Sequence, residues 1–151
     1  MIRRLVVGVG NDLRGDDAAG LEVARRVRLA APAGVEVVEA SGDGAALMDV
    51  WQRAALTIVV DACLSGAEPG TVRRFEAAEA PLPAVFASRS THAFGLAEAV
   101  EMARALGRLP DRLVVFAIEG RDFAAGTALT PAVARAVDEA SAAVLGEIAA
   151  A

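Results

Sequence analysis

The stretch RLVVGVGNDLRGDDAAG, residues 4–20, is the most informative about the fold, because it joins a short apolar run to the start of a helical pattern. The run LVVGV is rich in valine and is followed at once by turn residues, which is typical of a β-strand. Leu21, Val23, Ala24 and Val27 then recur at helical spacing, which predicts an amphipathic helix over 17–31. The stretch is therefore predicted to be the first strand-to-helix turn of an α/β fold.

The same alternation continues along the chain. Two further helices are expected, one ending at Gly107 and one in which Thr130 caps the first turn and Pro131 lies within it. The predicted strands are 3–9, 34–40, 55–62, 71–77 and 112–120. Strands 55–62 and 112–120 are almost wholly apolar, which favours central positions covered on both faces. Strand 71–77 follows 55–62 too closely for a helical crossover and is expected to be its antiparallel hairpin partner.

Length and order of elements together define the fold class. A chain of 151 residues fits one domain, so residues 1–151 are expected to form a single unit. The predicted architecture is an α/β three-layer sandwich, with a mostly parallel five-stranded sheet flanked by helices and one antiparallel strand.

Composition excludes several function classes. The net charge of −5 and the lack of a large basic cluster argue against a nucleic-acid partner. All fifteen basic residues are arginines, so Schiff-base and P-loop lysine chemistry is excluded. Cys63 is the only cysteine, and no apolar run approaches the roughly 20 residues of a membrane span. We expect a cytoplasmic protein without a membrane partner.

Candidate site residues follow the predicted strands. Ligands of open α/β sheets bind beyond the carboxyl ends of the strands. Asp16 and Asp17 come after the first strand, Asp61 ends the third, and His92, the only histidine, ends the segment 78–92. Oxygen and nitrogen ligands from three separate places are therefore predicted to converge on one rim.

Two other interpretations of the first turn stay open. A nucleotide-binding Rossmann-like module would use Gly8 and Gly10, but Leu13 stands where the third glycine of the fingerprint belongs. The acids would also oppose a phosphate at the helix N-terminus. Alternatively, Asp16 simply caps the helix and Asp17 lies in its first turn.

Asp61 and Cys63 offer different chemistries. A carboxylate that ends an apolar strand is costly unless it is paired or binds a cation, which favours a functional role for Asp61. Cys63 could instead be a thiol nucleophile activated by His92, although free cysteines are commonly buried as small apolar residues. The sequence contains no G-x-S-x-G serine nucleophile.

Four motifs in the same order resemble those of the hydrogenase maturation endopeptidases, which remove a C-terminal extension from the precursor of the nickel-iron hydrogenase large subunit. They are VVGVGNDLRGDDAAG, IVVDACLSGAEPGTV, STHAFGLAEAV and ALTPAVARAV, and together they span nearly the whole chain. The resemblance implies a twisted sheet flanked by helices and a metal site formed by Asp17, Asp61 and His92. It also implies nickel, supplied by the client precursor, as the metal.

The resemblance further implies the chemistry of the site. Carboxylates and imidazole suit nickel, and three protein ligands leave positions open for substrate or water. Cleavage would then use water at the metal, with Asp16 as an auxiliary base. A nickel-sensing chaperone that does not cut is the alternative. The stretch EASGDGAAL departs from the acidic, Gly-Gly-Thr-like turn of the family, and Asp43 is a candidate for the missing acid that grips the client tail.

Overall fold

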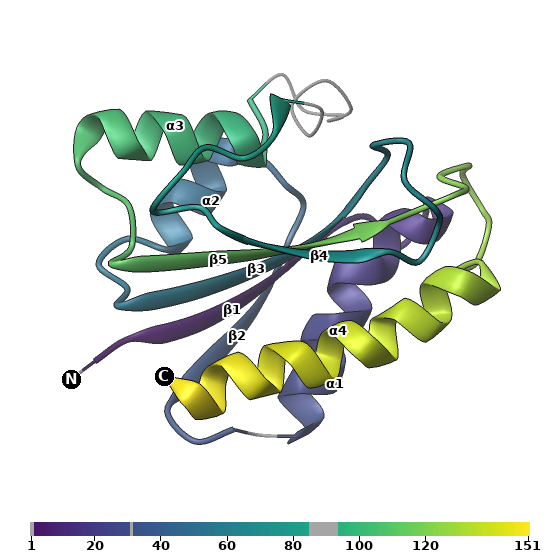
Figure 1. Cartoon of the computed structure of the whole chain (residues 1–151), viewed down its shortest axis with the longest axis horizontal. Helices are drawn as coiled ribbons and strands as arrows, with labels where there is room; N and C mark the ends of the chain where they lie inside the picture. Colours follow the sequence, from purple (N-terminus) through teal and green to yellow (C-terminus); the bar gives the residue numbers. More distant parts are fainter. Residues whose placement is uncertain (1, 31, 85–93) are drawn as a thin grey trace.

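The computed structural model describes residues 2–30, 32–84 and 94–151, which form a sheet between two layers of helices (Figure 1). The strands are β1 (Arg4–Val9), β2 (Val35–Ala40), β3 (Leu56–Cys63), β4 (Val72–Glu76) and β5 (Arg112–Glu119). The helices are the 3-10 turn η1 (Gly15–Ala18), α1 (Ala19–Ala30), α2 (Gly44–Val50), α3 (Leu96–Leu106) and α4 (Pro131–Ala150).

The sheet has the order β2-β1-β3-β5-β4. The first four of these strands are mutually parallel, and β4 runs antiparallel to β5. The antiparallel direction of β4 is thus as predicted, but its expected pairing with β3 is wrong. The chain after β3 instead passes over β5 and adds β4 at the far edge, where Phe75 pairs with Val115.

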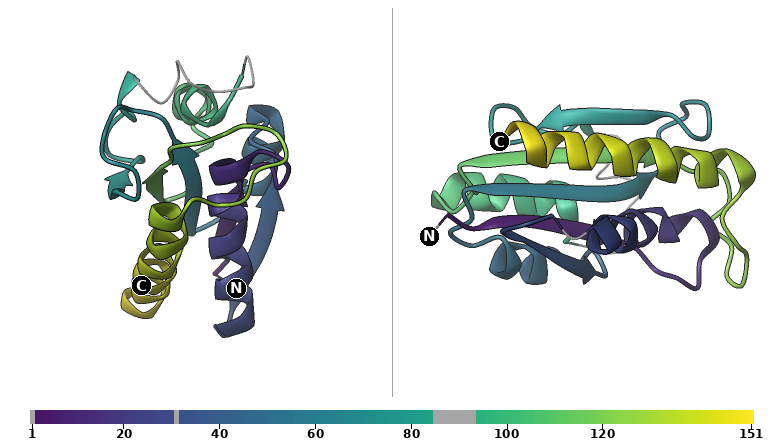
Figure 2. Two further views of the ribbon diagram at one scale, coloured as in Figure 1. Left: turned by 90° about the vertical axis from the view of Figure 1, so that its right-hand side faces the viewer. Right: turned by 90° about the horizontal axis from the view of Figure 1, so that it is seen from below.

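The helices cover both faces of the sheet, which confirms the predicted three layers. Helices α1 and α4 lie on one face, and α2 and α3 lie on the other (Figure 2). Strands β3 and β5 are interior strands, and their side chains are buried on both faces, as the continuous apolar runs predict. The first face buries Val23, Ile58, Phe116 and Val137, and the second buries Leu47, Trp51, Val59 and Val100.

Glycines allow α1 to lie directly against the sheet. A Cβ atom on Gly20 would overlap the carbonyl oxygens of Val9 and Val60, and one on Gly8 would overlap Gly20 O. The glycines of the first motif therefore serve close helix-on-sheet packing. No nucleotide phosphate is needed to explain them.

The helix ends are mostly as expected. Gly107 ends α3 with a φ of 66°, and Pro131 opens α4. Thr130 is the N-cap residue of α4, but its hydroxyl makes no capping hydrogen bond. Helix α2 is not predicted from the sequence, because seven residues give too short a periodic pattern. No helix in the described part of the chain is long and apolar enough to cross a membrane.

Candidate active site

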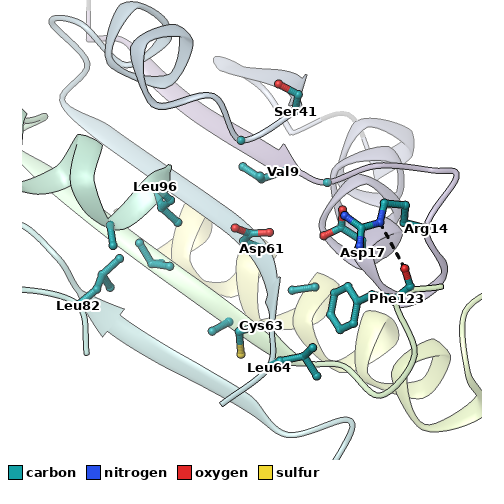
Figure 3. Close-up of a pocket in the computed structure, with 16 residues that line it drawn as sticks. Val9, Arg14, Asp17, Ser41, Asp61, Cys63, Leu64, Leu82, Leu96 and Phe123 are labelled. Atoms are coloured by element: carbon teal, nitrogen blue, oxygen red, sulfur yellow. Dashed lines mark hydrogen bonds between the residues drawn. The ribbon is translucent and has the colours of Figure 1, made fainter. Parts of the chain in front are cut away.

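A cavity of about 150 Å³ opens at the carboxyl ends of the central strands, where the sequence predicts the site (Figure 3). Asp17 reaches it from η1, in the turn that follows β1, and Asp61 reaches it from β3. Leu82, Leu96 and Val115 contribute apolar lining. The cavity therefore combines two carboxyl groups with an apolar wall, which suits a cation held beside a peptide side chain.

The position of Asp17 depends on Gly10. The backbone of η1 folds back over the end of β1, and a Cβ atom on Gly10 would overlap Asp17 O. Asn11 N donates to that same oxygen at 3.3 Å. Because only glycine permits this close approach, Gly10 places the half-buried Asp17 at the cavity.

Asp61 is electrostatically unfavourable as an anion. Burial, and then the negative charge of Asp17, raise the pKa of Asp61 to about 8, and the hydrogen bond from Ala62 N only partly offsets this. Two carboxylates that share a cavity repel each other, and a bound cation relieves the repulsion. The strand end therefore holds Asp61 in a position where a cation would stabilise its charged form.

Asp16 faces away from this chemistry. Asp16 is fully buried and is not among the described residues that line the cavity. Its backbone N–H donates to Asp122 O at 2.8 Å. Oδ2 accepts from Arg121 N at 2.8 Å and Asp122 N at 3.0 Å, and Oδ1 accepts from Thr130 N at 2.7 Å. The Thr130 hydroxyl also donates to the carboxylate. Asp16 thus fastens the 121–130 loop to the turn that carries Asp17.

These contacts correct the interpretation of Asp16 as a helix cap. Arg14 is the residue that precedes η1, and no side chain caps that turn. Burial by itself would raise the pKa of Asp16, but the hydrogen bonds from Asp122, Thr130 and Arg121 outweigh it and lower the pKa. The carboxylate is therefore stably charged and fully engaged.

The third predicted ligand, His92, lies outside the described residues. Within the described ranges, no three side chains of His, Cys, Asp or Glu gather as a metal site would require. The structure thus brings together Asp17 and Asp61. The role of His92 stays a prediction.

A buried polar cluster lies beside Asp61 and is missed by the sequence analysis. Glu119, only 1% exposed at the end of β5, accepts from Ser65 N at 2.8 Å and from the Ser65 hydroxyl. It also accepts from the Cys63 thiol at 3.5 Å and lies 3.6 Å from Arg73. The cluster links the end of β3 to the end of β5. The only sequence signal for it is that Glu119 directly follows an apolar run, as an acid at the end of a buried strand does.

Cys63 lines the cavity, but its surroundings make it a poor nucleophile. Burial and the adjacent carboxylate of Glu119 raise the pKa of the thiol to about 12, so almost no reactive thiolate exists at neutral pH.

We expect Cys63→Ser to retain the wild-type rate of peptide cleavage within about twofold, as substitutions that remove no catalytic interaction do. Initial rates by intact mass spectrometry, with thiol labelling of native and unfolded protein, check this. Loss of turnover without loss of folding would establish the thiol mechanism.

The stretch after β2 contributes to the cavity in a different way from the one expected. Asp43 is the N-cap of α2, and its side chain accepts from Ala45 N at 3.4 Å. Its neighbours Ser41 and Gly42 line the cavity. Asp43 therefore has a structural partner, and Ser41 is the polar residue of this stretch that reaches the cavity.

Comparisons with known proteins identify the family of this chain. Residues 22–147 match the hydrogenase maturation protease family. The hydrogenase expression/formation protein HupD of Bradyrhizobium diazoefficiens is 32% identical over 134 residues, covering 87% of this chain and 70% of HupD. The hydrogenase 2 maturation protease of Escherichia coli is 29% identical over 143 residues, covering 92% of this chain and 86% of that protein.

Solved structures show the same fold. The hydrogenase maturating endopeptidase HybD from Escherichia coli superposes with a TM-score of 0.84 at 28% identity, covering 97% of this chain and 92% of HybD. The chain belongs to the hydrogenase maturation protease family.

Proposed function

We propose that this protein is an endopeptidase that removes the C-terminal extension from a nickel-loaded precursor of a hydrogenase large subunit. The convergence of Asp17 and Asp61 on one cavity carries the proposal. Family membership supports peptide hydrolysis, and the names of the relatives support a hydrogenase client.

The donor set fits a nickel ion that arrives with the substrate. Two carboxylates and an imidazole are ligands that divalent first-row metals accept, and nickel is among them. Asp17 and Asp61 would hold the ion together with His92, and its positive charge would stabilise both carboxylates. The metal then acts as the feature by which the protease distinguishes a loaded precursor from an empty one.

The hydrolysis itself needs a water molecule and a proton acceptor. The water oxygen bonds to the carbonyl carbon of the scissile peptide, a carboxylate takes its proton, and the proton passes to the amine nitrogen as the C–N bond breaks. We assign the proton transfer to a carboxyl group of the cavity and not to Asp16, because both oxygens of Asp16 already accept hydrogen bonds. Asp16 is instead a positioning residue for the turn that carries Asp17.

The decisive experiment offers the protein a hydrogenase large-subunit precursor with and without nickel, and follows the tail by intact mass spectrometry. We expect wild type to shorten only the loaded precursor, and His92→Ala to leave it uncut because one ligand is lost. Asp49→Asn, an exposed substitution on α2, is the matched control and should cut normally.

Three outcomes would contradict parts of the proposal. Cleavage by His92→Ala would remove His92 from the site, and equal cleavage of the nickel-free precursor would remove nickel recognition. A stable complex with wild type and no change in mass would favour the chaperone that does not cut.

A further inference from the structure

Arg14 is the cationic side chain among the described residues that line the cavity. A second, shallower depression adjoins the cavity, and the two share Gly10, Arg14, Asp17 and Ser41. The depression continues the cavity toward Asn11 and Leu21, and the two together form a groove beside the acids. Arg14 therefore lies where the two parts of the groove meet.

The guanidinium of Arg14 is held in place without being neutralised. Its Nε donates to Phe123 O at 3.3 Å, as Figure 3 shows. The main chain next to it is also fixed, because Gly126 N donates to Leu13 O at 2.8 Å. Within the described part of the chain Arg14 forms no ion pair, whereas Arg25 pairs with three carboxylates on the surface.

A half-buried arginine of this kind is a hydrogen-bond donor with unused capacity. Guanidinium carries five N–H donors, and the contact with Phe123 uses only the one on Nε. The carbonyl oxygen of a peptide gains negative charge when water attacks it, and a fixed donor at that point stabilises the transition state more than the bound substrate. Two carboxylates alone would repel the negative charge that develops on this oxygen. The guanidinium of Arg14 beside them would stabilise it.

We propose that Arg14 binds the carbonyl oxygen of the scissile peptide bond, next to Asp17 and Asp61. This inference rests on the proposed function and adds a substrate-contacting residue to it. Asp16 supports the arrangement from behind, because it fixes the loop that contains Phe123.

Arg14→Gln and Arg14→Lys test the assignment with the nickel-loaded precursor. Loss of one such donor typically lowers kcat by about 10²–10³-fold, so we expect a fall of that size in Arg14→Gln with KM changed by less than about threefold. Arg14→Lys keeps the charge and should recover part of kcat. Arg135→Gln, an exposed substitution on α4 away from the cavity, is the matched control and should leave both constants unchanged.

Titration with nickel ion alone provides a readout that does not depend on activity. Removing a positive charge beside Asp17 and Asp61 should leave nickel affinity unchanged or tighten it, whereas weaker binding would overturn the assignment. A higher KM with unchanged kcat would also overturn it. Equal losses of kcat in both variants together with a lower Tm would overturn it too, because they indicate a structural role.

The two proposals can fail separately. If wild type does not cut, the proposed function is wrong and the assignment of Arg14 is wrong with it. If wild type and Arg14→Gln cut equally well, only the assignment of Arg14 is wrong.

Discussion

Asp61→Asn should make the metal-free protein more stable at pH 7.5 while abolishing cleavage of the precursor. The pKa of Asp61 is about 8 in the folded protein and near the ordinary aspartate value of 3.8 in the unfolded chain. Between these values the unfolded chain ionises and the folded protein resists ionisation, so the stability of wild type falls as pH rises from about 4 to about 8. Asparagine removes this penalty, and it also removes a negatively charged ligand from the cavity.

The size of the effect follows from the displacement of the pKa. A pKa shift of one unit corresponds to about 1.4 kcal/mol of folding free energy. Contact of the Asp61 carboxyl group with solvent at the cavity reduces the penalty, so Asp61→Asn should raise the free energy of unfolding by an amount on the order of 2 kcal/mol. For a chain of this length this is about 4–8 °C in Tm. Thermal unfolding in chelator at pH 4 and pH 7.5 measures it, with wild type and variant converging at pH 4.

Asp49→Asn is the control for this comparison, since the side chain is exposed on α2. Its Tm should follow that of wild type at both pH values. An Asp61→Asn variant that is less stable than wild type at pH 7.5, or one that still processes the nickel-loaded precursor, would show that Asp61 is a structural residue.

Asp16→Ala should have the opposite effect on stability. The substitution leaves three backbone N–H groups and one hydroxyl, all in part-buried hydrogen bonds, without their acceptor. Leaving buried donors unsatisfied costs about 1–3 kcal/mol for each group that water cannot reach, so a total of about 3–5 kcal/mol is expected. The corresponding loss of Tm is about 10 °C.

Asp16→Asn distinguishes a positioning residue from a base. The amide keeps the shape of the carboxylate but turns an NH₂ group toward N–H donors, so it should also lower Tm, by less than alanine does. Because hydrogen bonds lower the pKa of Asp16, its contribution to stability is present above about pH 4 and is lost as pH falls further. If Asp16 were a base, Asp16→Asn would abolish kcat at an unchanged Tm.

The positions of the two cavity acids were predictable from the local sequence. Asp17 lies in the turn after the first apolar run and Asp61 lies near the end of the third, and parallel strands bring their carboxyl ends to one edge of the sheet. The roles within the pair Asp16 and Asp17 were not separable in this way, because neighbouring residues of a tight turn point in different directions. Glu119 and Arg14 were missed for a similar reason: their partners lie 54 to 109 residues away.

Local sequence was sufficient for the five strands in their order and for the helices α1, α3 and α4, because hydrophobic period and turn residues act over a few positions, whereas the short helix α2 was missed. The role of Gly8 and Gly20 in the close packing of α1 became clear only from the structure, because the atoms that leave no room for a Cβ belong to neighbouring elements. Long-range contacts, in contrast, set the pairing of β4 with β5 and the attachment of the 121–130 loop to Asp16. These choices depend on which distant hydrogen-bond donors and apolar faces become buried together, and no pattern within a short stretch of sequence encodes that.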